Sequence, residues 1–460
     1  MIPTTNEAYK LLHNGSIALS QIEANGMKID VDYLNRTIAS TEKKIKRSTK
    51  RLEKDKLYKT WRKKYGKETN LGSRQQLGIV LFEIEKYPCT SFTPTGRPCA
   101  DATSLSEIDL PFVRNLLKVE KLKKANSTYL GGILQESTDG YLHPFFNLHL
   151  AITYRSSSSN PNFQNIPIRD PTMAKLIRRT FIARKNHRIV EVDYGGVEIA
   201  GAACYHKDPV MISYIEDKTK DLHRDMAGQC FKLKRNQINK EIRYCGKNMF
   251  VFPQFYGDYY LHCAQNLWEA IGKMKLQTAD GIPLKEHLQS QGVRRLGNCN
   301  PKKRPLKGTF ERHLKEVEGD FWNKRFKVYG KWKKNWYNEY LKNGFFETLT
   351  GFRIEGSMKR NEVINYPVQG TAFHWLLWSI IRIQKLLKKY NMKTLLVGQI
   401  HDSLVADVYK KELQNYLEIV KQVMTVDIRK HWKWINVPLN IDAEVAPIGG
   451  SWYEKKERKI

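Results

Sequence analysis

Two stretches of sequence, RIVEVDY (188–194) and TLLVGQIHDSLVADV (394–408), decide the fold. Both are rich in the apolar and β-branched residues of buried strands, and in both an aspartate marks a strand end. Asp193 ends the first strand, and Asp402 lies at the tip of an apolar hairpin. On spacing alone an aspartate at a turn is more often a turn former. Two strand-end carboxylates that met in one sheet would instead bind hard divalent cations such as Mg²⁺.

Predicted helices surround these few strands. Residues 16 to about 135 are mostly helical in pattern, and Asp208 and Asp221 are typical helix starts. FFETLTGFRIEG (345–356) predicts a hairpin, and GNCNPKKRPLKG (297–308) predicts a surface loop. Strands that are few and separated by helices indicate an α+β enzyme.

The charge balance points to a polyanionic partner. The 460 residues include 78 Lys and Arg against 47 Asp and Glu, a formal net charge of +31. Nucleic acid is the first candidate for such a surface, because phosphate neutralisation is the usual use of this charge. The seven cysteines form no CxxC pair, so neither a disulfide framework nor a structural zinc site is expected. No signal core and no run of 18 apolar residues occurs, so we expect no membrane span.

Candidate phosphate-binding residues lie between the two aspartates. Arg243 and Lys247 are four residues apart on one helix face, so both could reach the same triphosphate. His223 falls in the first turn of the helix that follows Asp221, where free N–H groups favour anions. Basic residues four positions apart more often belong simply to a solvated helix surface. Tyr256 closes the Arg243 helix and could stack on a base, although a lone aromatic is more often core packing.

Five ordered motifs resemble the polymerase domain of family A DNA polymerases, from about residue 16 to Trp452. They are RSSSSNPNFQNIPIR (155–169), VEVDYGGVEIA (190–200), DLH (221–223) with EIRYCGKNMFVFPQFYG (241–257), NYPVQGTA (365–372) and VGQIHDSLV (397–405). The resemblance implies a right-hand fold with an antiparallel palm sheet, helical fingers and a helical thumb. The implied regions are a lead-in (1–15), the thumb (16–135), the palm (136–207 and 345–460) and the fingers (208–344).

The resemblance also implies the catalytic residues. Asp193 and Asp402 would hold two Mg²⁺ ions, with the backbone carbonyl of Tyr194 as a further ligand. Two such ions would activate a primer 3′-hydroxyl and stabilise the leaving pyrophosphate. Lys247 would donate a proton to the pyrophosphate. Glu198 would sit against the sugar and exclude a 2′-hydroxyl, which favours dNTPs over rNTPs.

The remaining implied residues bind nucleotide or DNA. Those that would contact the incoming dNTP are Arg169, Glu198, His223, Arg243, Lys247, Phe252 and Tyr256. Those that would contact the primer–template are Arg155, Asn162, Gln164, Asn365, Gln369 and His401. Amide side chains suit the minor groove, where acceptors lie in similar places for every base pair.

Two departures from the family pattern matter. The interval from Lys247 to Tyr256 is one residue longer than usual and contains Pro253, so we expect a bulge or kink in this helix. The extra residue leaves open whether Val251 or Phe252 contacts the incoming sugar. Ser403 follows the second aspartate where many members have Glu, which weakens an accessory carboxylate role.

Several wider expectations complete the sequence analysis. ALSQIEANGMKID (18–30) resembles the entry into the thumb, which leaves no room before it for a 3′–5′ exonuclease. We therefore expect a stand-alone polymerase subunit or a fragment, with proofreading or processivity supplied by a separate subunit. We expect a cytoplasmic monomer. The sequence FVFPQFYGDYY (250–260) resembles phage members of the family, so the cytoplasm would be that of a bacterial host if the gene is viral. The alternatives are a single-subunit RNA polymerase and a catalytically inactive DNA-binding protein.

Overall fold

The computed structural model describes residues 3–89, 92–93, 96–101, 104–105, 108–168 and 170–460. Its central feature is a five-stranded antiparallel sheet in the spatial order β12-β11-β6-β10-β9. The strands are β6 (His187–Gly195), β9 (Leu395–Ile400), β10 (Ser403–Tyr409), β11 (Asn440–Val445) and β12 (Lys456–Arg458). Both predicted strand regions are confirmed, the first as β6 and the second as the β9–β10 hairpin.

Side chains of β6 alternate between two hydrophobic cores, as the two-residue period of a strand requires. Val190, Val192 and Tyr194 belong to the core under the helices that cover one face of the sheet. These helices include α1 (Thr5–Asn25), α9 (Val197–His206), α18 (Arg360–Lys389), α19 (Leu413–Lys421) and α20 (Ile428–His431). Ile189 points to the opposite core, which also contains Trp452. Asp193 shares that second face by alternation and lies two residues before the end of the strand.

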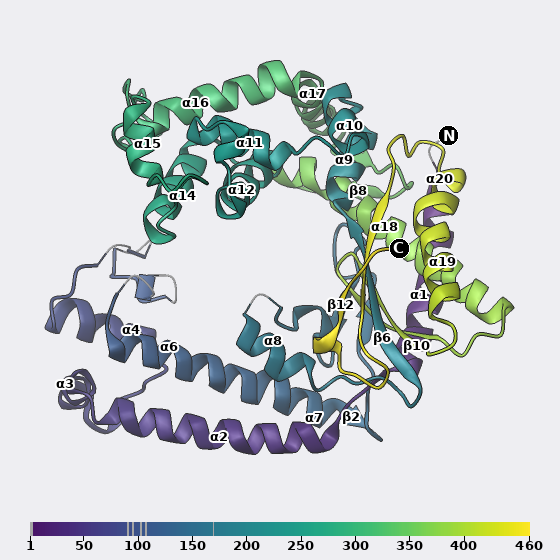
Figure 1. The fold of residues 1–460 in the computed structure, drawn as a ribbon, viewed down its shortest axis with the longest axis horizontal. Helices are drawn as coiled ribbons and strands as arrows, with labels where there is room; N and C mark the ends of the chain where they lie inside the picture. The colour runs from purple at the N-terminus through teal and green to yellow at the C-terminus, as the bar shows by residue number, and fades with distance from the viewer. Residues whose placement is uncertain (1–2, 90–91, 94–95, 102–103, 106–107, 169) are drawn as a thin grey trace.

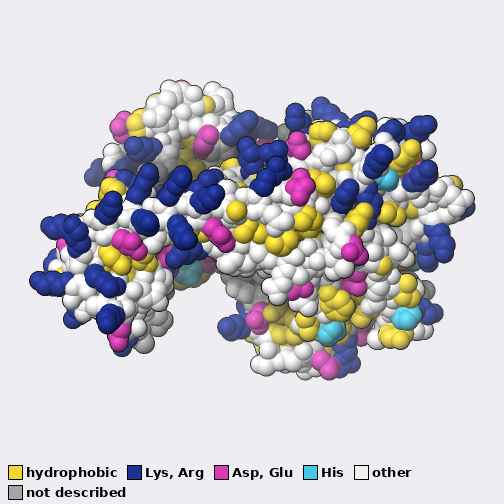
Figure 2. Space-filling model, turned by 90° about the horizontal axis from the view of Figure 1, so that it is seen from below, with side chains coloured by type: hydrophobic (Ala, Val, Ile, Leu, Met, Phe, Trp, Pro, Cys, Tyr) yellow, Lys and Arg dark blue, Asp and Glu magenta, His cyan; other side chains and the backbone are white. Residues whose placement is uncertain are grey.

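One group of helices forms an arm beside the sheet (Figure 1). It consists of α2 (Val31–Glu53), α3 (Lys56–Tyr65), α4 (Arg74–Gly78), α6 (Pro111–Lys124) and α7 (Gly132–Glu136). The arm has its own hydrophobic core, in which Trp61 and Leu81 are fully buried. The strongly basic residues 40–67 fall in two helices because Asp55 starts α3 by accepting from the Leu57 N–H at 2.9 Å. Lys and Arg side chains gather on the outer side of this arm (Figure 2).

A second group of helices lies across from the arm (Figure 1). It comprises α10 (Pro209–Glu216), α11 (Leu222–Phe231), α12 (Lys240–Gly246), α13 (Phe252–Phe255), α14 (Tyr260–Lys273), α15 (Leu284–Ser290), α16 (Phe310–Asp320) and α17 (Lys327–Asn343). Asp208 and Asp221 cap α10 and α11 as predicted. Residues 297–308 form the predicted loop.

Short strands and helices connect these groups. The predicted hairpin at 345–356 is confirmed as β7 (Phe345–Glu347) and β8 (Arg353–Glu355). The other short elements are β1 (Met27–Lys28), β2 (Ser137–Thr138), β3 (Tyr141–Leu142), β4 (Phe145–Asn147), β5 (Ser157–Ser159) and α8 (Pro171–Arg178).

The architecture is the predicted α+β right hand, with an antiparallel palm sheet, helical fingers and a helical thumb. Helix α1 packs against α18 and β9 of the palm, although part of it falls within the predicted thumb. The predicted domain boundaries themselves stay predictions. Within the described residues, no helix combines the length and apolar character that crossing a bilayer requires.

The second core generates a stability prediction. Trp452 is fully buried, stacks on Phe163 with ring centroids 5.5 Å apart, and donates from Nε1 to Glu191 at 2.7 Å. We expect Trp452→Ala to lower the free energy of unfolding by about 3–5 kcal/mol through the lost packing and the cavity left behind. Trp452→Phe, which keeps an aromatic ring, should lose less. Urea denaturation measures both, and an unchanged midpoint for Trp452→Ala would contradict this role.

Candidate active site

The pairing of β6 with β10 brings Asp193 and Asp402 together. In this register Asp193 lies opposite Ser403, the residue that follows Asp402. The Tyr194 N–H donates to the Asp402 carbonyl oxygen at 3.4 Å, which holds the hairpin tip against the end of β6. The two predicted aspartates therefore lie side by side at one end of the sheet, although 209 positions separate them in the sequence.

The electrostatics of this pair favour a bound cation. Asp193 is open to solvent on one side, but the surrounding protein raises its pKa to about 7, helped by the negative charges of Asp402 and Glu191. Burial also raises the pKa of Asp402, while the nearby Arg155 and His401 lower it. A divalent cation between the carboxylates would relieve both the repulsion and the desolvation.

The carboxylates of Asp193 and Asp402 suit Mg²⁺ better than a metal that needs all its ligands from protein side chains. In the described part of the chain, no three His, Cys, Asp or Glu side chains form a metal-binding group. Mg²⁺ commonly binds one or two carboxylates and completes its shell with water and substrate phosphates. The Tyr194 hydroxyl is buried and donates to the Met424 carbonyl at 3.1 Å. Only the backbone of Tyr194 could therefore take part.

Arg155 lies between the carboxylate pair and Glu198. Its Nη2 is 3.5 Å from Oδ1 of Asp402, and its Nη1 is 3.9 Å from Oε1 of Glu198. The three side chains are about one-quarter exposed, with values of 23%, 24% and 27% respectively. Arg155, which is predicted to contact DNA, therefore lies beside both the predicted metal site and the predicted sugar site.

Five predicted residues line one small pocket. Glu198 comes from α9, Phe252 and Tyr256 come from the α13 region, and Asn365 and Gln369 come from α18. The Tyr256 hydroxyl donates to the Glu198 carboxylate, and Asn365 Nδ2 donates to the Tyr256 carbonyl at 3.0 Å. Residues from three separate motifs therefore form one continuous wall.

The predicted irregularity in the fingers helix is a π-helical segment. Residues Lys247–Val251 have π geometry between α12 and α13, and Pro253 lies in the first turn of α13. A π-bulge accommodates one extra residue without breaking a helix. The two candidates for the sugar contact differ in their surroundings. Val251 is fully buried in the core, whereas Phe252 lines the pocket beside Glu198.

Two of the predicted phosphate-binding residues lie at the neighbouring hollow. His223 and Arg243 line it together with the Gly195–Gly196 turn that follows Asp193. Burial lowers the pKa of His223 to about 4, and the positive charges of Arg243 and Lys247 add to this effect. Lys247 Nζ lies 5.2 Å from the ring centre of Phe252. Lys218, Lys220 and Arg235 also line the hollow, so it is a cationic site beside the turn that follows Asp193.

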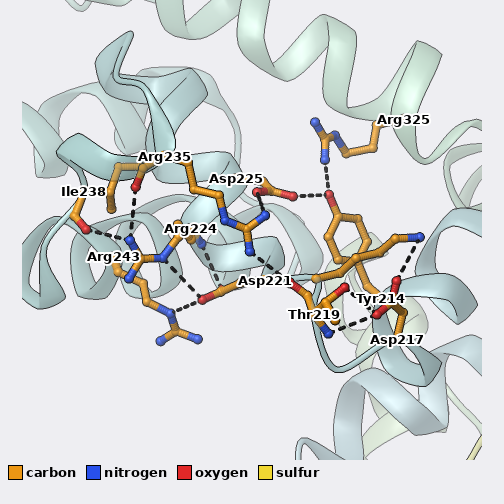
Figure 3. Close-up of polar contacts among 11 residues, drawn as sticks. Tyr214, Asp217, Thr219, Asp221, Arg224, Asp225, Arg235, Ile238, Arg243 and Arg325 are labelled. Carbon is orange, nitrogen blue, oxygen red and sulfur yellow. Dashed lines mark hydrogen bonds and ion pairs between the residues drawn. The ribbon is translucent and has the colours of Figure 1, made fainter.

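Asp221 holds Arg243 in this site. It accepts from Arg243 Nε at 2.7 Å and from the Arg224 N–H at 3.0 Å, and it lies between these two residues in Figure 3. Sequence analysis identified Asp221 only as a helix cap. Its contact with Arg243 spans 22 positions and has no local signal.

The other predicted residues have varied surroundings. Gln164 Nε2 donates to Gln399 Oε1 at 2.8 Å, in a network that also includes Ser156. Asn162 accepts from the Asn165 N–H at 3.2 Å and caps a short 3₁₀ turn. His401 is exposed at the tip of the β9–β10 hairpin. Arg169 lies outside the described residues.

Sequence analysis missed two side chains close to the aspartates. Asp442 lies directly opposite Asp193 in the β11–β6 pairing, and its charge contributes to the raised pKa of Asp193. Gln399 is fully buried, and its Nε2 donates to the His401 carbonyl at 2.6 Å. The two-residue period of β11 could have indicated which residues of that strand share a face with Asp442. It could not have indicated that β11 pairs with β6.

The right-hand fold and the paired carboxylates beside a cationic hollow place the chain in the class of right-hand polymerases. The model of DNA polymerase family A matches residues 35–282 and 315–454, which is most of the chain. The chain belongs to DNA polymerase family A, a family that generally uses divalent metal ions.

Individual relatives agree with this assignment. The chain is 27% identical over 474 residues to DNA polymerase I of Lactococcus lactis, covering 98% of this chain and 46% of that protein. It is 26% identical over 449 residues to the DNA polymerase of Bacillus phage SP01, covering 92% of this chain and 44% of that protein. The chain thus spans about half the length of these curated relatives.

A solved structure has the same fold. The polymerase domain of Pol1 from M. smegmatis, in complex with DNA primer–template and dNTP, superposes with a TM-score of 0.73. It is 23% identical in sequence, and the match covers 96% of this chain and 70% of that one.

The raised pKa of Asp193 gives a prediction about pH. An acid whose folded pKa lies above its unfolded value destabilises the fold as pH rises between those two values, from about 4 to about 7. With chelator present, Asp193→Asn should therefore raise the unfolding temperature at about pH 8, with a smaller gain at about pH 5. The stabilisation should be on the order of 1 kcal/mol, because solvent screens an exposed carboxylate. Thermal unfolding at both pH values checks this, and an equal gain at both would contradict it.

Proposed function

We propose that this chain is a template-directed DNA polymerase that adds dNTPs to a primer 3′-hydroxyl. The observation that carries the proposal is the β6–β10 register, which puts Asp193 beside Asp402 next to a cationic hollow. Two Mg²⁺ ions would be held by these carboxylates and the Tyr194 carbonyl. When bound, the ions supply activation of the 3′-hydroxyl and charge stabilisation of the leaving pyrophosphate. Membership of DNA polymerase family A supports the same reaction.

The cationic hollow would hold the triphosphate of the incoming nucleotide. Arg243 and His223 line it. Arg169 is the further residue proposed to bind the triphosphate. Because Asp221 binds Arg243 through Nε, the terminal nitrogens of the guanidinium stay available to phosphate oxygens. Lys247 would protonate the departing pyrophosphate. A triphosphate would also favour the charged form of His223, since it would offset the neighbouring cations.

The pocket beside this hollow would select the sugar. Glu198 is fixed from two sides, by the Tyr256 hydroxyl and by Arg155. A carboxylate held in this way would crowd a 2′-hydroxyl, and Phe252 would pack on the same sugar. This arrangement and the family assignment disfavour the RNA polymerase alternative. The close approach of the two carboxylates disfavours an inactive DNA-binding protein.

The primer–template would lie across the palm. Arg155, Asn162, Gln164, Asn365, Gln369 and His401 are the residues proposed to contact it. Asn162 and Gln369 carry amides that suit the acceptors of the minor groove. The basic arm surface supplies sequence-independent attraction to phosphates (Figure 2). Action as a monomer in the cytoplasm stays an expectation.

Removal of either metal-binding carboxylate tests the reaction directly. We expect Asp193→Ala and Asp402→Ala to reduce primer extension by at least about 10³-fold, because each would remove a carboxylate from the metal pair. Primer–template affinity should change little, since most DNA affinity comes from phosphate contacts. Gel-based extension and fluorescence anisotropy measure the two quantities. Asp320→Ala, on the exposed end of α16, is a matched control that should extend normally. Full extension by either active-site variant would refute the assignment.

The proposed sugar gate has its own test. Glu198→Ala should increase the ratio of rNTP to dNTP incorporation by at least about tenfold, because the steric block disappears. Glu198→Gln keeps the bulk and should retain most of the discrimination. Single-nucleotide incorporation with each sugar gives the ratios. A ratio that Glu198→Ala leaves unchanged would remove Glu198 as the gate.

A further inference from the structure

Residues 283–314 of the fingers fall between the two stretches that the family model matches. They contain α15 and a long loop that leads into α16. The sequence here is basic: eight Lys and Arg stand against Glu286 and Glu311. The segment lies at the end of the fingers away from the sheet (Figure 1).

The loop is held in a defined conformation by its own backbone. The Arg294 N–H donates to the Gly308 carbonyl at 3.0 Å, and the Phe310 N–H donates to the Arg295 carbonyl at 2.8 Å. These contacts close the loop at its base. Glu311 is buried and accepts from the Cys299 N–H at 3.0 Å, which ties the middle of the loop to α16.

Apolar contacts fix the segment to the rest of the fingers. Leu284, Leu288, Val293 and Phe310 are buried in the main core. His287 Nε2 lies 3.0 Å from the Lys232 carbonyl oxygen, which adds a polar contact to α11. A segment anchored in this way keeps its backbone in place, so the positions from which its exposed side chains project are fixed.

The segment carries a group of exposed cations, which we call the fingertip patch. It consists of Arg294, Arg295, Lys302, Lys303, Arg304 and Lys307, and all six are exposed. None of the six side chains makes an ion pair or a hydrogen bond with another residue of the described chain. Nearby Arg312, by contrast, pairs with Glu316 at 2.7 Å. Of the two acids in the segment, Glu311 is buried and already bonded, so Glu286 alone is exposed.

We propose that the fingertip patch binds the phosphates of the uncopied, single-stranded template ahead of the primer terminus. This inference rests on the proposed polymerase function. The residues proposed to hold the primer–template belong largely to the palm, and the nucleotide pocket lies between palm and fingers. The strand that has not yet been copied must therefore continue on the fingers side of the pocket. Six unpaired cations suit a flexible polyanion, whose phosphates can adapt to them without base recognition.

The test compares two primer–templates that differ only in the length of the 5′ overhang, about 3 and about 20 nucleotides. The six-residue variant replaces every member of the fingertip patch by Gln. The wild-type chain should bind the long overhang several-fold more tightly, and the variant should lose this difference. Its salt dependence on the long overhang should also weaken, by about 0.7 in the log–log slope for each lost phosphate contact. Fluorescence anisotropy at several salt concentrations measures both.

A control variant with the same charge change separates a local effect from a general one. It replaces six exposed cations of α18, α19, α20 and the β10–α19 turn, at the opposite end of the molecule in Figure 1, by Gln: Lys385, Lys388, Lys411, Lys421, Arg429 and Lys430. This variant should keep the wild-type preference for the long overhang. Equal losses in the two variants would overturn the proposal, as would an unchanged preference in the fingertip variant. Loss that affects the short overhang equally would assign the patch to duplex DNA and also overturn it.

Failure of the proposed function would be visible separately. The overhang preference is a binding measurement and requires no catalysis. A chain that binds the long overhang through the fingertip patch but extends no primer would contradict the polymerase reaction alone. A chain that extends primers normally but shows no overhang preference would contradict the fingertip patch alone.

Discussion

The antiparallel register between β6 and β10 is the constraint on which the site depends. It places Asp193 opposite Ser403, and thereby beside Asp402, at a position where burial and like charge oppose ionisation. Such a pair is unfavourable in the metal-free protein and becomes favourable when a divalent cation is shared. A shift of the register by one residue would turn Asp193 into the opposite core. Packing on both faces of the sheet prevents that shift, since Val192 and Ile189 fill separate cores.

Ionic contacts beneath the site strengthen the same constraint. Glu191 lies two residues before Asp193 on the same face, and burial alone would raise its pKa. The Lys455 ammonium and the Trp452 indole outweigh this effect and lower the pKa of Glu191. Glu191 therefore stays charged, fixes the strand from below and adds to the negative field at Asp193. Cations of the fingers, among them Arg243, line the adjacent hollow together with the Gly195–Gly196 turn that follows the carboxylate.

Local patterns in the sequence were sufficient for much of this arrangement. The caps at Asp208 and Asp221, the strand that carries Asp193 and the hairpin around Asp402 all follow from short-range chemistry. The end of that strand was predicted two residues too early, because pairing with β11 extends β6 to Gly195. The extra residue after Lys247 predicted an irregular helix, which is the π segment. Contacts between distant segments were not predictable in the same way. Asp221 with Arg243, Gln164 with Gln399, and Asp442 with Asp193 each need the tertiary fold, because no local pattern specifies the partner.

The most direct test of the account is the location of the metal ions. Crystals of the chain with Mn²⁺, a primer lacking its 3′-hydroxyl, template and a matching dNTP would be measured by anomalous diffraction. The account predicts two anomalous peaks, both within coordinating distance of Asp193 and Asp402, with the Tyr194 carbonyl on one of them. Peaks absent from these carboxylates, or bound by only one of the two residues, would contradict a shared metal site.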